Sequence, residues 1–124
     1  MDKLQKVILY VDDDRDFRDA VRVIIEAGGY RMVEADSAEQ GIQVFKAERP
    51  DLVLVDLMME EVDAGTRLVR KIQALGSKVP IYMLSSTGDG FVAAADYGAL
   101  GLAGVFQKPI EPKVLLTALR AKLG

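Results

Sequence analysis

The sequence predicts an α/β domain built on a doubly wound, five-stranded parallel sheet. Short apolar runs alternate with stretches of helical periodicity along the chain, which is typical of repeated βα units. Two runs, Val7–Val11 and Leu52–Val55, are apolar or aromatic throughout, as strands covered on both faces are. Both end directly in aspartate, at Asp12 and Asp56. Ligands bind beyond the carboxyl ends of such strands, so these acids lie where a functional site is expected.

The first βα unit combines a buried strand with an amphipathic helix. We expect the strand at 6–11 and the helix at 15–27, which Gly28 and Gly29 end. One face of this helix is apolar. It consists of Phe17, Val21, Ile24 and Ile25.

The second unit begins with a less apolar strand at 30–34, which we place at an edge of the sheet. Ser37–Gln40 fits a capping box, in which the hydroxyl and the amide satisfy exposed backbone donors at a helix start. Ile42 and Phe45 then face inward, and the helix ends at Arg49–Pro50.

The third unit has a strand at 52–55 and a helix that ends before Gly76. This helix carries Leu68, Ile72 and Leu75 at helical spacing. Residues 78–80 introduce the fourth strand, Ile81–Leu84.

The last third of the chain begins with an Ala-rich helix expected at 89–98, which several glycines punctuate. Each interior glycine costs a helix about 1 kcal/mol relative to alanine, so we expect this region to be the most mobile. Val105–Phe106 predicts the fifth strand. The closing helix carries Val114, Leu115, Ala118 and Leu119.

Composition limits what the chain can do. At 124 residues it is expected to form one domain, 1–124, that buries about two-thirds of its unfolded surface. The net charge of -3 and scattered basic residues argue against direct nucleic-acid binding. With no Cys and no His, any catalysis must use carboxylates, amines, hydroxyls or a hard cation. No apolar stretch resembles a signal peptide or a membrane span, so we expect a cytoplasmic protein without a membrane partner.

Four features converge on the carboxyl edge of the predicted sheet. They are Asp12 and Asp13, Asp56, Ser85 and Ser86, and Lys108 with Pro109. Carboxylates about 4 Å apart repel by roughly 4 kcal/mol at an effective dielectric near 20, and a divalent cation such as Mg²⁺ removes this cost. A carboxylate can attack phosphorus if charge is neutralised. The cation and Lys108 would supply that charge, and the Ser85 hydroxyl with nearby backbone N–H groups would bind phosphoryl oxygens.

These motifs closely resemble the response-regulator receiver domain of bacterial two-component signalling, over nearly the whole chain. The resemblance is carried by Ile8–Asp14, Pro50–Met59, Pro80–Ser85 and Lys108–Pro109. It implies a flavodoxin-like fold with strand order 2-1-3-4-5. It also implies a stand-alone regulator, similar to chemotaxis regulators, whose phosphoryl donor is a phosphohistidine on a sensor histidine kinase or a phosphotransfer protein.

The resemblance also implies a role for each site residue. Asp56 would be the phosphoacceptor. Asp13, Asp56 and the Met58 backbone carbonyl would bind Mg²⁺, or Mn²⁺ in its place, and Asp12 would act through bound water. Ser85, followed by Ser86, would occupy the switch position, and Lys108 would contact the phosphoryl group. The bond between Lys108 and Pro109 would be cis.

The chain departs from the family pattern at two places. Val105, three residues before Lys108, occupies a second switch position, which in the family usually holds an aromatic residue. Phe106 points to the opposite face. An acidic loop with Glu60 and Glu61 replaces the usual Pro-Gly and is one residue longer. This acid would either strengthen cation binding or repel an anionic donor, and the sequence leaves both open.

Several of these residues also have ordinary structural interpretations. Asp14 is best explained as the N-cap of the first helix. Ser85 and Ser86 would alternatively start a turn, and Lys108 would be an exposed loop lysine. Met58 would serve packing or partner contact, and Glu60 and Glu61 a solvated face.

We expect a phosphorylation switch that alters binding to an unidentified downstream protein through 89–98, the fifth strand and the closing helix, as a monomer or weak dimer. A degenerate receiver acting as a constitutive interaction domain is one alternative. An aspartyl-phosphate phosphohydrolase is disfavoured because Met58, not an acid, stands two residues after Asp56. A flavin module is disfavoured because three aspartates after the first strand repel phosphate.

Overall fold

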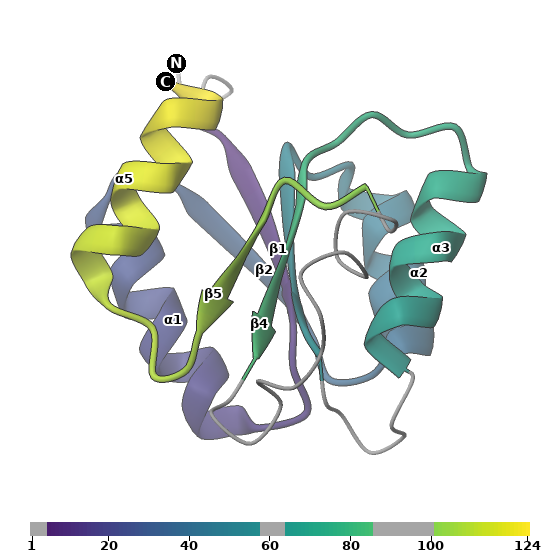
Figure 1. The fold of residues 1–124 in the computed structure, drawn as a ribbon, viewed down its shortest axis with the longest axis horizontal. Helices are drawn as coiled ribbons and strands as arrows, with labels where there is room; N and C mark the ends of the chain where they lie inside the picture. Colours follow the sequence, from purple (N-terminus) through teal and green to yellow (C-terminus); the bar gives the residue numbers. More distant parts are fainter. Residues whose placement is uncertain (1–4, 58–63, 86–100) are drawn as a thin grey trace.

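The computed structural model describes residues 5–57, 64–85 and 101–124, which form a parallel sheet covered by helices on both faces (Figure 1). The strands are β1 (Val7–Val11), β2 (Arg31–Ala35), β3 (Leu52–Asp56), β4 (Ile81–Ser85) and β5 (Gly104–Gln107). The helices are α1 (Arg15–Ala27), α2 (Ala38–Glu48), α3 (Ala64–Ala74) and α5 (Pro112–Leu123). The strand order β2-β1-β3-β4-β5 confirms the predicted fold class.

The sheet has a hydrophobic core on each of its two faces, and a pair of helices covers each core. Helices α1 and α5 lie on one side and α2 and α3 on the other (Figure 1). The strands β1, β3 and β4 are buried almost throughout, which explains their continuous apolar sequence. Alternate strand residues supply opposite cores, since Ile8 and Tyr10 face α1 and α5 whereas Leu9 and Val11 face α2 and α3.

The strand β2 forms an edge of the sheet, as predicted from its weaker apolar character. The Arg22 guanidinium reaches this strand from α1. Its Nη1 donates to the Met32 carbonyl at 3.0 Å, and its Nη2 lies 3.1 Å from the Glu34 carboxylate. One outward-facing backbone acceptor of β2 is thus paired within the molecule.

The helix ends mostly follow the sequence. Asp14 caps α1, accepting from the backbone N–H groups of Asp16 at 2.9 Å and Phe17 at 3.4 Å. Ser37 caps α2 through the Gln40 N–H at 3.1 Å. The capping box is incomplete, however, because the Gln40 side chain accepts from Asp36 N–H rather than from the N-cap residue.

Two apolar positions of the predicted helices are exposed. Leu75 is 50% exposed, and it lies just beyond α3, which ends at Ala74, whereas the spacing predicts that Leu75 belongs to the helix. The chain leaves the helix towards Gly76, whose φ of +80 only glycine adopts readily, and Val69 takes a buried place beside Leu68 and Ile72. In α5, Leu115 and Leu119 are buried but Val114 is half exposed. The helix expected at 89–98 lies outside the described residues.

Among the described helices, none combines the length and the apolar character that crossing a membrane requires.

Candidate functional site

Three aspartates meet at the carboxyl edge of the sheet. Asp12 and Asp13 directly follow β1, and Asp56 is the last residue of β3. Because β1 and β3 pair in register, with Val11 opposite Val55, the acids that follow become neighbours. One oxygen from each carboxylate lies within 4.8 Å of the others. Asp12 and Asp56 are buried, at 0% and 3% exposure, whereas Asp13 is exposed.

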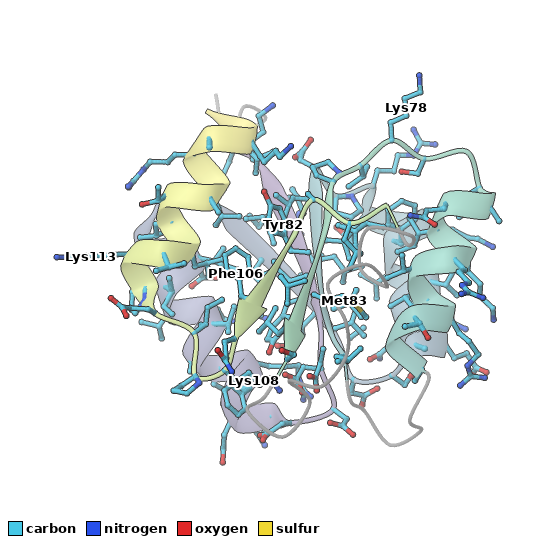
Figure 2. The ribbon with its side chains drawn as sticks, in the orientation of Figure 1. Lys78, Tyr82, Met83, Phe106, Lys108 and Lys113 are labelled. Carbon is cyan, nitrogen blue, oxygen red and sulfur yellow. The ribbon has the colours of Figure 1, made fainter. Side chains whose placement is uncertain are left out.

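Lys108 joins this cluster from the end of β5. Its Nζ lies 3.0 Å from Asp12 Oδ2 and 3.2 Å from Asp56 Oδ1, and 4.2 Å from the centre of the Phe17 ring. In Figure 2 Lys108 lies at the end of the sheet where β4 and β5 finish, and Lys78 lies at the opposite end. The Lys108–Pro109 peptide bond is cis, the isomer that the resemblance implies.

Ser85 lies beside Lys108 at the end of β4. Its residue is 8% exposed, and its carbonyl accepts the Lys108 backbone N–H at 2.7 Å. This backbone hydrogen bond joins the ends of β4 and β5 at the site. Of the other predicted positions, Met58, Glu60, Glu61 and Ser86 lie outside the described residues. Val105 is 38% exposed on β5, and the neighbouring Phe106 is buried on the other face against Tyr82.

Asp12 is held by a set of donors. The Tyr10 hydroxyl donates to Asp12 Oδ2, and the Asp14 backbone N–H donates to Oδ1 at 2.9 Å. Arg18 Nη1 donates to the Asp12 carbonyl at 2.7 Å. Both carboxylate oxygens of this buried residue therefore have partners from the chain itself.

The environment makes Asp56 a weaker acid than an ordinary aspartate. Burial and the neighbouring Asp12 charge raise the pKa of Asp56 from 3.8 to about 7, although Lys108 opposes the rise. Burial alone would lower the pKa of Lys108, but hydrogen bonding and attraction to Asp12 and Asp56 outweigh it, so that pKa is raised. Burial, with the charge of Asp12, also raises the pKa of Tyr10, which keeps its hydroxyl a proton donor.

Gly65 permits α3 to approach the site closely. A Cβ atom at this position would lie 2.6 Å from the Asp56 carbonyl and 3.2 Å from the Leu57 carbonyl. No side chain fits at such distances without moving the backbone. The start of α3 and the end of β3 are thus packed backbone against backbone.

The sequence alone does not indicate that Tyr10, Phe17, Arg18 or Gly65 belongs to the site. Tyr10 stands two residues before Asp12, and strand alternation places both on one face, which was the available signal. The spacing of Phe17 indicates only that it belongs to the apolar face of its helix. The contacts of Arg18 and Gly65 depend on tertiary packing and left no recognisable local pattern.

The donor set fits a small divalent cation. The three carboxylates provide hard oxygen ligands, and one ammonium cannot balance their three negative charges when all are ionised. The exposed Asp13 leaves one side of the cluster open to solvent. This arrangement is suited to holding Mg²⁺ next to the Asp56 carboxylate.

The fold and the site together define a CheY-like receiver, a class of signalling domain. The chain belongs to the response regulator receiver domain family, whose match extends over residues 8–120. Domains of this family bind Mg²⁺ through acidic residues and interact with histidine kinases or phosphotransfer proteins.

Curated relatives include longer transcriptional regulators. The chain is 33% identical over 119 residues to the transcriptional regulatory protein CseB of Streptomyces coelicolor, covering 96% of this chain and 50% of that protein. It is 33% identical over 122 residues to the phosphate regulon transcriptional regulatory protein PhoB of Pseudomonas aeruginosa, covering 95% and 52%. The chain thus spans about half the length of these relatives.

Solved structures agree in fold over the whole domain. A CheY-like receiver domain protein from Methanospirillum hungatei JF-1 is 28% identical, with a TM-score of 0.83 covering 96% of this chain and 94% of that one. A response regulator receiver protein from Pseudomonas putida is 27% identical, with a TM-score of 0.77 covering 94% and 97%.

Proposed function

We propose that the chain is a phosphorylation switch in which Asp56 accepts a phosphoryl group from a phosphohistidine on a sensor kinase or phosphotransfer protein. The observation that carries this proposal is the position of Lys108 Nζ between Asp12 and Asp56, inside a cluster of three carboxylates. The resemblance implies the same acceptor. Each group has a role in phosphoryl transfer.

In the transfer step, an Asp56 carboxylate oxygen forms a bond to phosphorus while the bond from phosphorus to the donor imidazole nitrogen breaks. The electron pair of the broken bond stays on that nitrogen. Lys108, already 3.2 Å from Asp56 Oδ1, stabilises charge on the phosphoryl oxygens. The Ser85 hydroxyl, at the end of the adjacent strand β4, is the hydrogen-bond donor that we assign to a further oxygen.

Asp13 and Asp56 would hold Mg²⁺, with Asp12 acting through water. When bound, the cation supplies the positive charge that lets an anionic carboxylate meet an anionic phosphoryl group. The Met58 carbonyl, expected as a further ligand, lies outside the described residues.

The output of the switch would be a change in protein contacts at β5 and α5, with the segment expected at 89–98. Val105 on β5 and Val114 on α5 are exposed apolar residues that a partner could cover. Whether the domain acts alone or within a longer regulator like its relatives, transfer to Asp56 would be the input. We propose that the domain is cytoplasmic and monomeric or weakly dimeric, and that it does not bind nucleic acid itself.

The direct test is incubation with Mg²⁺ and acetyl phosphate, followed by intact-mass measurement. We expect one phosphate-sized mass increase in the parent and in Asp36→Asn, an exposed aspartate that follows β2 at the same sheet edge. Asp56→Asn should show none, and EDTA should abolish the increase. An unchanged increase in Asp56→Asn would refute the assignment, and repeated phosphate release from a generic phosphomonoester would instead indicate a phosphohydrolase.

A further inference from the structure

The Asp12 Oδ2 atom has two donors of different kinds. One is the Tyr10 hydroxyl, fixed in the core, and the other is the Lys108 ammonium at 3.0 Å, carried by a flexible side chain. Asp12 is fully buried, so no bulk water replaces a donor that leaves. The pairing of Asp12 is therefore redundant at this one oxygen.

Lys108 has a second task in the proposed switch, because its ammonium must contact the phosphoryl group on Asp56. Turning towards that group weakens its contact with Asp12. If Lys108 were the only protein donor to Oδ2, this movement would leave that oxygen of a buried carboxylate without a donor from the chain, which is costly. The Tyr10 hydroxyl removes that cost because it stays in place.

We propose that Tyr10 is a positioning residue, whose phenol keeps Asp12 paired and so frees the Lys108 ammonium to move from Asp12 to the phosphoryl group on Asp56. This inference rests on the proposed function. The ring of Tyr10 packs in the core with Ile8 and Leu54, but only its hydroxyl reaches the site. A phenylalanine would keep the packing and remove the single atom that matters.

The test compares Tyr10→Phe with Tyr82→Phe. Tyr82 is buried in the same core on β4, and its ring stacks on Phe106 with centroids 5.1 Å apart (Figure 2). Calorimetry would measure the affinity for Mg²⁺ alone and, at saturating Mg²⁺, for beryllofluoride, which stands in for the phosphoryl group. We expect Tyr10→Phe to weaken beryllofluoride binding by about tenfold while Mg²⁺ binding changes less than about threefold. Tyr82→Phe should leave both affinities unchanged.

The outcomes separate this inference from the proposed function. If the parent binds neither ion, the proposed function fails. If the parent binds both but Tyr10→Phe binds beryllofluoride equally well, or loses both affinities in equal proportion, the role of Tyr10 is refuted.

A measurement on the parent does not depend on the folding of a variant. The NMR signal of the Tyr10 hydroxyl proton should persist after Mg²⁺ and beryllofluoride are added, because the bond to Asp12 remains. Disappearance of that signal on activation would also refute the inference.

Discussion

The surroundings of the Asp56 side chain make its ionisation unfavourable. Burial and the charge of Asp12 raise its pKa to about 7, so below about pH 7 the metal-free site favours a proton where the loaded site would have a cation. Proton and cation therefore compete for the same oxygens. The weak acidity of the acceptor is part of how the site tolerates three aspartates in one place.

This pKa predicts how metal-free stability depends on pH. The folded state binds more protons than the unfolded state between pH 3.8 and about 7, so the contribution of Asp56 to stability is lost as pH rises through this window. The loss is at most about 1.4 kcal/mol per pH unit. In urea titrations with EDTA, the stability advantage of Asp56→Asn over the parent should grow up to about pH 7 and then level off.

The control for this experiment is Asp36→Asn, which removes an exposed charge. Its difference from the parent should vary little over the same pH range. A parallel curve for Asp56→Asn and Asp36→Asn would contradict the raised pKa.

The site residues differ in how far the sequence predicts them. The predicted positions of Asp12, Asp13, Asp56, Ser85 and Lys108 all lie at one edge because parallel strands bring their carboxyl ends together. The role of Tyr10 was not predictable because its strand is buried on both faces, and an aromatic residue in such a strand is consistent with ordinary core packing. A polar role for its hydroxyl emerges only from the contact with Asp12.

At the scale of elements, the start of α1 separates two kinds of aspartate. Asp12 and Asp13 belong to the carboxylate cluster, whereas Asp14 accepts from the N–H groups of the first helical turn. Three consecutive acids thus divide between the site and the helix. The division explains why the loop is so acidic without assigning every acid to a ligand.

We predict that Asp14→Ala destabilises the fold by about 1 kcal/mol because it removes the N-cap. Asp14→Asn, which retains a capping oxygen, should remain close to the parent, and neither change should shift Mg²⁺ affinity by more than about threefold. Urea unfolding and calorimetry would measure the two effects. As a control, Asp19→Ala removes an exposed residue 3.9 Å from Arg15 and should cost less than about 0.5 kcal/mol.

Most elements were predictable because periodicity reports burial. The runs in β1, β3 and β4 and the apolar face of α1 led to nearly the observed bounds. The prediction that the third helix includes Leu75 is wrong because helical spacing alone does not reveal where a helix stops. The helix α3 ends one residue earlier, and the Leu75 side chain is exposed. The predicted capping box is only half present because the Gln40 side chain accepts from the Asp36 N–H instead of the N-cap N–H.

At the scale of the whole molecule, the site is assembled from segments distant in the sequence. Asp12, Asp56 and Lys108 come from the ends of three strands, and their distances hold only when the sheet is complete. A ligand that needs all three groups binds the folded state alone. Ligand binding and global stability should therefore be coupled.

We predict that Mg²⁺ with beryllofluoride raises the thermal midpoint of the protein. At a concentration one hundred times the dissociation constant, the stabilisation should be about 2.7 kcal/mol. A thermal scan of the parent should show this rise, and Mg²⁺ alone should give a smaller one. Equal shifts in the parent and in Asp56→Asn would show that the ions stabilise the fold elsewhere.

The contact between Arg22 and the Met32 carbonyl has a consequence for how copies of this protein behave when crowded. A border strand with free carbonyls invites a strand from another molecule, which is the first step towards fibrous aggregates. Here a guanidinium already occupies one of those carbonyls and brings charge to the border. A strand from another molecule would have to displace the Arg22 guanidinium, so this contact disfavours aggregation by strand addition at β2.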